Sequence, residues 1–237
     1  MNLVKNKWTN KEYKEFLHYL NSLSEDSYKD FNKNLIPDTP NIIGIRVPVL
    51  KEIAKEISKG NWREFLSIKK GSIHEEVLIE GLVITNVKLE YKEFIKHITI
   101  FADKVYNWAI CDYTFMNLKQ VKKYRKELWN EIDKFLKSKN PWHQRIGIII
   151  LLDYYLEDEY IDKVLEKIDK INSDFYYVQM ASAWTIATAF AKYREKTLKY
   201  MQTAKINDDI MNMTIKKIRE SNRVKKQDKE LVLKYHR

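Results

Sequence analysis

One stretch of the sequence decides the fold: Tyr106-Asn107-Trp108-Ala109-Ile110-Cys111-Asp112. On a helix, Trp108 and Asp112 stand one turn apart on the same face, which sets an indole ring beside a carboxylate within an apolar run. Arg145 follows Asp112 by 33 residues, and Trp184 follows Arg145 by 39. This spacing predicts a helical repeat array in which successive units each offer one residue to a shared surface.

The residues at these intervals form a candidate binding site. Arg145 belongs to Trp142-His143-Gln144-Arg145, so an indole ring also precedes the arginine. Two tryptophans, an arginine and an aspartate on one concave face suit a cationic ligand, or an anionic and sugar-like one. A structural alternative remains open, because helical tryptophans are usually core residues and Asp112 with Arg145 would also make a buried ion pair.

Composition favours a globular helical protein that binds phosphates. The 237 residues are 44% apolar and 32% charged. Five glycines and four prolines are few turn-forming residues for a β-rich fold. The net charge of +10 and the pI of about 9.3 suit a nucleic-acid partner. The alternative is that the positive charges only form a solvated surface, since much of the excess positive charge comes from lysine.

The sequence also predicts a cytoplasmic protein. Cys111 is the only cysteine, so no disulfide forms within the chain and no cysteine-based metal site is expected. Residues 1–16 contain no apolar segment typical of a signal peptide. The longest apolar run, 146–152, is too short to span a bilayer, which takes about 20 residues.

Apolar spacing and capping residues predict about a dozen helices, paired as antiparallel hairpins at roughly 37–45-residue intervals, in a single domain over residues 1–237. Thr9 with Glu12 forms a capping box, Asn140-Pro141 opens a helix through the apolar run, and Ser173 caps another. The expected helices follow Thr9 and then cover 25–34, 48–59, 62–68, 74–84, 89–100, 107–118, 121–138, 145–155, 160–171, 175–190, 194–203, 208–220 and 225–235.

Two further features of the sequence are candidates for a functional site. His74, Glu75, Glu76 and Glu80 are a metal-ligating or acid–base combination, but helical spacing puts Glu76 and Glu80 on one face and turns Glu75 away. We therefore expect no metal site, and one glutamate partly buried against a neighbouring helix. Arg46 lies just ahead of a helix that begins near Pro48, where an anion is favourable; the alternative is a surface arginine in a loop.

Several motifs together resemble the AlkD-type DNA alkylation repair family of DNA glycosylases with HEAT-like repeats. The motifs are Gly44-Ile45-x-x-Pro48, Trp108-x-x-x-Asp112, Trp142-x-x-Arg145, Gln179-Met180-Ala181-x-Ala183-Trp184 and Lys217-Ile218-Arg219-Glu220-Ser221. Each motif alone is weak, but the ordered set is fairly specific and covers about three quarters of the chain. The resemblance implies an all-α, right-handed superhelical array of antiparallel helix pairs, whose concave basic face holds duplex DNA.

The resemblance also implies an activity, namely hydrolysis of the N-glycosidic bond of N3- or N7-alkylated purines in base excision repair. It implies that Asp112 is the catalytic carboxylate, that Trp108 and Trp184 cradle the deoxyribose and backbone of the damaged nucleotide, and that Arg145 contacts the DNA backbone. Trp142 is a further DNA-binding candidate beside Arg145. The resemblance implies no organic cofactor, no metal, a monomer, and a cytoplasmic or nucleoid-associated location.

One departure from the family pattern favours an alternative. Members of the family use a full helix ahead of the Gly-Ile-x-x-Pro motif to grip DNA, whereas residues 25–41 contain Pro37 and Pro40 and hold little more than two helical turns. A branch of the family has a reduced element here. The alternative is therefore a non-catalytic relative that acts as a nucleic-acid-binding or protein-binding helical scaffold.

Overall fold

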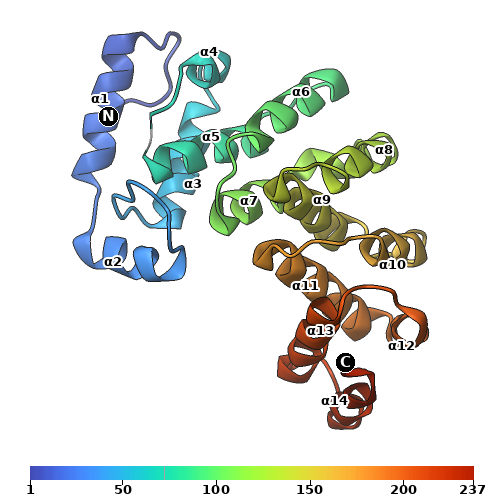
Figure 1. Ribbon diagram of the computed structural model, residues 1–237. Coiled ribbons are helices and arrows are strands. Elements are labelled where there is room, and N and C mark those ends of the chain that lie inside the picture. Colours follow the sequence, from blue (N-terminus) through green and yellow to red (C-terminus); the bar gives the residue numbers. More distant parts are fainter. Residues whose placement is uncertain (72) are drawn as a thin grey trace. The chain divides into compact units, whose positions relative to one another are not determined.

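The computed structural model describes residues 1–71 and 73–237, and over these residues every regular element is a helix (Figure 1). The predicted all-α fold is confirmed. The chain divides into two compact units, Met1–Tyr124 and Arg125–Arg237. The prediction of one domain over residues 1–237, and of a right-handed superhelix, stays a prediction. Within the described residues, no helix is long and apolar enough to cross a membrane.

The first unit contains seven α-helices and one 3-10 helix in its described residues. They are α1 (Asn10–Ser22), α2 (Asp26–Leu35), α3 (Val47–Ile57), α4 (Trp62–Ser67), α5 (His74–Asn86), α6 (Tyr91–Ala102), α7 (Trp108–Phe115) and η1 (Lys119–Lys122). Helix α5 is central, because it packs against both α3 and α7 and all of its residues except Asn86 are buried.

The second unit contains the remaining helices. They are α8 (Arg125–Leu136), α9 (Pro141–Tyr154), α10 (Ile161–Asp169), α11 (Tyr176–Lys192), α12 (Arg194–Thr203), α13 (Asp208–Glu220), α14 (Lys226–Leu231) and η2 (Val232–Tyr235). Helix α11 packs against α9 and α13, and α8 packs against α9. Helix α11 is therefore the central element of this unit.

Local capping signals set several helix starts as predicted. Thr9 and Glu12 form the capping box of α1, with the backbone N–H of Thr9 2.8 Å from Oε2 of Glu12. The Asn140 side chain accepts from the backbone N–H of Trp142 at 2.9 Å at the start of α9. The apolar run 146–152 is buried within α9, so its assignment as helix rather than strand is confirmed.

Tertiary contacts override the predicted helix over 121–138. The structure has a 3-10 turn over 119–122 and starts α8 only at Arg125. The Gln120 side chain accepts from the backbone N–H of Leu89 at 2.6 Å and donates to the carbonyl oxygen of Val87 at 3.0 Å. The Tyr124 hydroxyl donates to the Leu89 carbonyl at 2.9 Å. These bonds hold the turn against the linker that joins α5 to α6. A continuous helix through this segment would break them.

The predicted cap at Ser173 is wrong by two residues. The N-cap of α11 is Phe175, which makes no side-chain capping bond. The Ser173 hydroxyl instead accepts from the backbone N–H of Phe175 at 3.3 Å. The serine therefore stabilises the linker that enters the helix, rather than the free N–H groups of its first turn.

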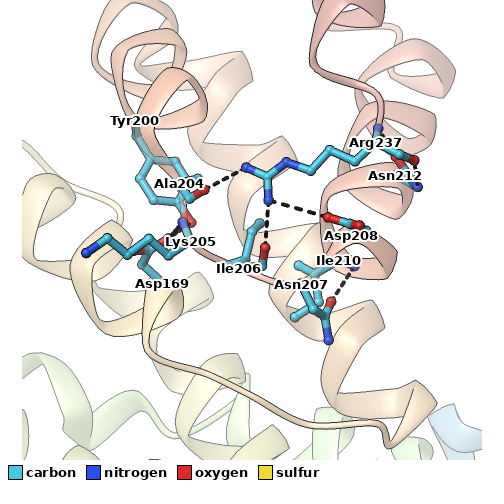
Figure 2. Close-up of polar contacts among 10 residues, drawn as sticks. All are labelled: Asp169, Tyr200, Ala204, Lys205, Ile206, Asn207, Asp208, Ile210, Asn212 and Arg237. Carbon is cyan, nitrogen blue, oxygen red and sulfur yellow. Dashed lines mark hydrogen bonds and ion pairs between the residues drawn. The ribbon is translucent and has the colours of Figure 1, made fainter.

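The side chains of Arg237 and Asp169 hold the link between α12 and α13 (Figure 2). The Arg237 guanidinium donates to the carbonyl oxygens of Ala204 and Ile206 at 2.6 and 2.8 Å. The Asp169 carboxylate accepts from the backbone N–H of Lys205 at 2.7 Å. These bonds occupy the polar backbone groups of the link and so fix where α13 begins.

Candidate functional site

Helix α7 presents the first pair of candidate site residues. Its N-cap is Asn107, whose side-chain oxygen accepts from the backbone N–H of Ile110 at 2.9 Å. Trp108 is the first helical residue and Asp112 lies one turn later, and both are half-buried. The predicted pairing of indole and carboxylate on one helix is therefore present, and the Asp112 side chain is not sealed in the interior.

The Asn107 side chain is itself held by a neighbouring loop and by the first residue of α5. Its side-chain amide lies 2.9 Å from the Thr39 hydroxyl and 3.3 Å from Nδ1 of the buried His74. Burial lowers the pKa of His74 and favours the neutral imidazole, although the Glu75 charge acts in the opposite direction. A neutral Nδ1 accepts the amide hydrogen bond, so the start of α7 is anchored to α5.

Trp108 is held against α2. Its indole Nε1 donates to the carbonyl oxygen of Leu35 at 3.3 Å, and its ring packs against a cluster of Ile36, Ile42 and Ala109. A small pocket of about 110 Å³ lies beside the ring, between α2 and the inner helices α3, α5 and α7. One face of Trp108 is therefore used for packing, and a part of the ring remains exposed.

Tyr113 extends the aromatic surface next to Asp112. Burial raises the pKa of the Tyr113 phenol, and Tyr28 and the Asp112 charge raise it further. The Lys51 ammonium lies 5.8 Å from the centre of the Tyr113 ring. The surroundings of Asp112 thus combine aromatic faces with a nearby cation, which suits an anionic or sugar-containing ligand.

The Gly44-Ile45 motif has a structural role. Gly44 has φ +89°, and a Cβ there would lie 2.5 Å from the Glu25 carbonyl oxygen. The Glu75 carboxylate accepts from the backbone N–H groups of Gly44 and Ile45 at 2.7 and 3.3 Å, and from that of Ile43 at 3.1 Å. Glu75 therefore anchors the loop that joins α2 to α3.

The expectation that Glu75 faces away from the packed side of its helix is wrong, because Glu75 is buried on α5. Glu75, Glu76 and Glu80 are all at most 3% exposed, because α5 has neighbours on every side. Tyr13 donates to Glu76 and Lys104 to Glu80, so each carboxylate has a partner from another element. Across residues 1–71 and 73–237, no three His, Cys, Asp or Glu side chains are grouped as metal ligands are.

Arg46 is the N-cap residue of α3 and is exposed. Its Nε and Nη2 atoms donate to the two carboxylate oxygens of Glu25, both at 2.9 Å, and its guanidinium lies 5.0 Å from the centre of the Tyr28 ring. This bidentate pair lowers the pKa of Glu25. The carboxylate that the position favours is thus supplied by Glu25, the N-cap residue of α2, and a DNA phosphate would compete with it.

The second unit holds the other candidate residues. Arg145 is 4% exposed on α9, and its Nη1 donates to the Tyr177 carbonyl oxygen at 2.7 Å. The Trp142 ring stacks on the Tyr177 ring with centres 5.2 Å apart and meets Phe175 edge-on at 5.1 Å. Trp142 and Arg145 therefore converge on the start of α11. The Trp184 ring, on the same helix, is 36% exposed.

The structure brings the predicted residues together in two groups. Trp108 and Asp112 share α7 in the first unit, while Trp142 and Arg145 meet at Tyr177 in the second. Sequence reasoning missed the anchoring roles of Asn107 and Glu75. An N-cap residue type directly ahead of Trp108 was a usable signal for the first, but no local signal connects Glu75 with the distant Gly44 loop.

Comparison with known proteins gives a family match. A family model described as "DNA alkylation repair enzyme" matches residues 16–232. A search of curated proteins returned no significant match. The matched range covers nearly the whole chain and includes every candidate site residue.

Proposed function

Because the chain belongs to the DNA alkylation repair enzyme family, we propose that it is a monofunctional DNA glycosylase with HEAT-like repeats. Its substrate would be duplex DNA that carries N3- or N7-alkylated purines. The observation that carries this proposal is that Asp112 and Trp108, both half-buried rather than buried, lie one helical turn apart on α7.

The proposed reaction is hydrolysis of the N-glycosidic bond. An alkylated purine is already cationic, so the bond electrons leave with the base as a neutral purine and no general acid is needed. The sugar passes through an oxocarbenium-like state, which a carboxylate stabilises. Water then adds to the sugar carbon, and Asp112 positions that water and accepts its proton before the proton passes to solvent.

The other candidate residues have supporting roles in this proposal. Indole faces attract the growing positive charge on the sugar, and each such contact contributes about 0.5–2 kcal/mol. Trp108 and Trp184 would supply these faces, and Trp184 is sufficiently exposed to do so. Trp142 would contact the DNA backbone directly. Arg145, which is 4% exposed, would do so in exchange for the Tyr177 carbonyl, and Arg46 in exchange for its partner Glu25.

We further propose that the protein works as a monomer, without a metal or organic cofactor, in the compartment that holds the DNA. No residue role in the reaction above depends on a bound cofactor.

One observation favours a second candidate function, a non-catalytic scaffold that binds nucleic acid. Helix α2 contributes no buried residue, and its last carbonyl group accepts the Trp108 indole N–H. A short α2 placed against Trp108 restricts access to one side of that ring. In the scaffold, the cationic surfaces would bind duplex DNA without base release.

The decisive experiment is assay of N7-methylguanine release from alkylated duplex DNA. We expect release by the wild-type protein and a loss of about 10²–10⁴-fold in rate for Asp112→Asn, since the amide keeps the shape but not the charge. Asp162→Asn is the matched control, because Asp162 is an exposed residue on α10 whose ion pair with Lys196 is at the surface. It should release base at the wild-type rate.

Two results would contradict parts of this proposal. Release that is equally fast in Asp112→Asn would remove Asp112 from the reaction. If the wild-type protein releases no base but still binds duplex DNA in a salt-dependent way, the non-catalytic scaffold function is supported instead.

A further inference from the structure

A groove runs along α13, between this helix and the segment 232–237 that follows α14. Helix α13 packs against the long helix α11 and against the short elements α14 and η2, which have six and four residues. The groove has a volume of about 680 Å³. The short neighbours therefore leave a part of α13 open, and we call this opening the α13 groove.

The wall opposite α13 is fixed at the end of the segment 232–237. The Asn212 side-chain amide donates to the carbonyl oxygen of Arg237 at 2.7 Å, and its oxygen accepts from the backbone N–H of Arg237 at 3.0 Å (Figure 2). At the other end of the segment, Val232 is buried. Both ends are thus held, so the groove is a built feature of the second unit.

The floor of the groove is apolar. Met213 and Ile215 line it from α13, and Leu233 lines it from the opposite wall. Ile215 is buried, Met213 is half-buried and Leu233 is 37% exposed. Apolar side chains gathered on a surface mark interaction sites, and methionine adapts its shape to a partner. A partner that covers these three residues gains by removing them from water.

The rim of the groove carries cations. Lys216 and Arg219 lie one turn apart on α13 and are both exposed, and one acidic residue, Glu220, lines the groove beside them. Among the residues that the structure describes, no carboxylate forms a salt bridge with Lys216 or Arg219. The two charges are therefore available to acidic groups of a partner.

We propose that the α13 groove docks an amphipathic helix of a partner protein, whose apolar side chains cover the floor and whose carboxylates meet the rim. Helices recognise grooves in this way, through apolar anchors spaced three and four residues apart. The contact gives the protein a protein partner in addition to its proposed activity on DNA.

The chemistry of the groove favours this partner over two others. A nucleic acid would use the rim cations, but its phosphates would gain nothing from the apolar floor. A second copy of this chain would bring the same cationic rim and a net charge of +10, so a symmetric contact would place like charges together. A helix that is both acidic and apolar complements the floor and the rim at once.

The probe is a synthetic amphipathic helix of glutamate and leucine, about 14 residues long so that it can follow the 13-residue α13. Its binding to the whole chain is measured by fluorescence anisotropy at about 0.15 M salt, where charges more than about 8 Å apart are largely screened. Two control peptides carry lysine in place of glutamate, or alanine in place of leucine. We expect both to bind more weakly, because each complements only the floor or only the rim.

The rim is tested by Lys216→Glu/Arg219→Glu, which should weaken binding of the glutamate–leucine peptide about tenfold or more, since like charges then face each other. Arg223→Glu/Lys225→Glu is the matched control, because it also reverses one lysine and one arginine but at residues that line a different hollow. It should bind the peptide like the wild type. Lys216→Arg/Arg219→Lys keeps both charges and should do so too.

The floor is tested by Leu233→Ser, which should weaken binding about tenfold through the loss of apolar contact. Ile100→Ser is its control, because Ile100 is an exposed apolar residue on α6 in the first unit. The methyl resonance of Met213, assigned with Met213→Leu, should shift when the peptide is added. That of Met116, which is half-buried in the first unit, should stay. Circular dichroism checks that all variants keep their helix content.

Three outcomes would overturn the docking site. The glutamate–leucine peptide could fail to bind at about 1 mM. The rim variant and its control could lose the same affinity. An undamaged DNA duplex could displace the peptide in a way that depends on the two rim cations, which would make the groove a nucleic-acid surface. None of these measurements involves base release, so the docking site and the glycosylase stand or fall separately.

Discussion

The indole Nε1 of Trp108 donates a hydrogen bond to the carbonyl oxygen of Leu35, at 3.3 Å. This bond joins the end of α2 to the start of α7, the helix that also carries Asp112. Helix α2 buries none of its residues, so it has little apolar packing of its own to hold it in place. The candidate site and the short helix ahead of the Gly-Ile-x-x-Pro motif are thus physically connected.

Replacing Trp108 by phenylalanine should loosen α2. Phenylalanine keeps an aromatic six-membered ring but lacks the indole N–H donor, and a neutral hydrogen bond contributes about 0.5–1.5 kcal/mol. Amide hydrogen exchange in residues 26–35 should therefore become roughly 2- to 13-fold faster, since 1.4 kcal/mol corresponds to tenfold. Mass spectrometry of a peptide that covers α2 measures this change.

Trp184→Phe is the control for this measurement, because Trp184 lies on α11 in the other unit and is 36% exposed. Exchange in α2 should be the same in this variant as in the wild type. Unchanged exchange in Trp108→Phe would show that packing alone, and not the indole hydrogen bond, holds α2.

Replacing Glu75 by glutamine should destabilise the first unit. The carboxylate accepts three backbone N–H groups from the Gly44 loop, and hydrogen bonds to a charged group contribute about 1.5–3 kcal/mol. We expect a loss of this size in the free energy of unfolding, measured by urea titration. Glu52→Gln on the exposed face of α3 is the control and should change stability by less than about 0.5 kcal/mol. Similar losses in both variants would contradict an anchoring role.

Lys70 should make stability depend on pH in the alkaline range. Burial lowers its pKa from 10.5 to about 8; the Lys104 charge lowers it slightly further, and the Glu80 charge acts in the opposite direction. The charged ammonium is therefore less favourable in the folded state than in the unfolded chain. This loss of stability is complete below about pH 8 and disappears as the pH rises to 10.5.

The variant that tests this is Lys70→Met, which keeps an unbranched side chain but removes the ammonium that lies 4.2 Å from the centre of the Phe65 ring. Between pH 8 and 10.5, the free energy of unfolding of the wild type should rise relative to that of the variant. Urea titrations at several pH values measure the difference, and titration of the other lysines cancels between the two proteins. A difference that is constant across this range would show that Lys70 titrates normally.

Much of the fold could be predicted because its signals are local. The capping box of Thr9 and Glu12 and the Asn140-Pro141 start of α9 involve residues within one helical turn, and the structure has both. The pairing of Trp108 with Asp112 on one helix is equally local. Helical periodicity and capping act over three or four residues, so a sequence contains them in full.

Two of the misses depend on residues far apart in the chain. The turn that replaces the first residues of the expected 121–138 helix is held by bonds from Gln120 and Tyr124 to the linker at 87–89. The burial of Glu75 depends on a loop some 30 residues earlier. Helical spacing correctly separates Glu75 from Glu76, but it cannot show that α5 has neighbours on both faces.

Spacing along the chain and matched motifs were enough to predict the all-helical class, most helix starts, the family and the placing of an indole one turn from a carboxylate. The surroundings of those groups became known only from the packing of distant segments. That packing ties the Trp108 N–H to Leu35, buries Arg145 against Tyr177, and sets Lys216 and Arg219 at the rim of a groove. Burial and pairing depend on which distant segments meet, and no local pattern contains that information.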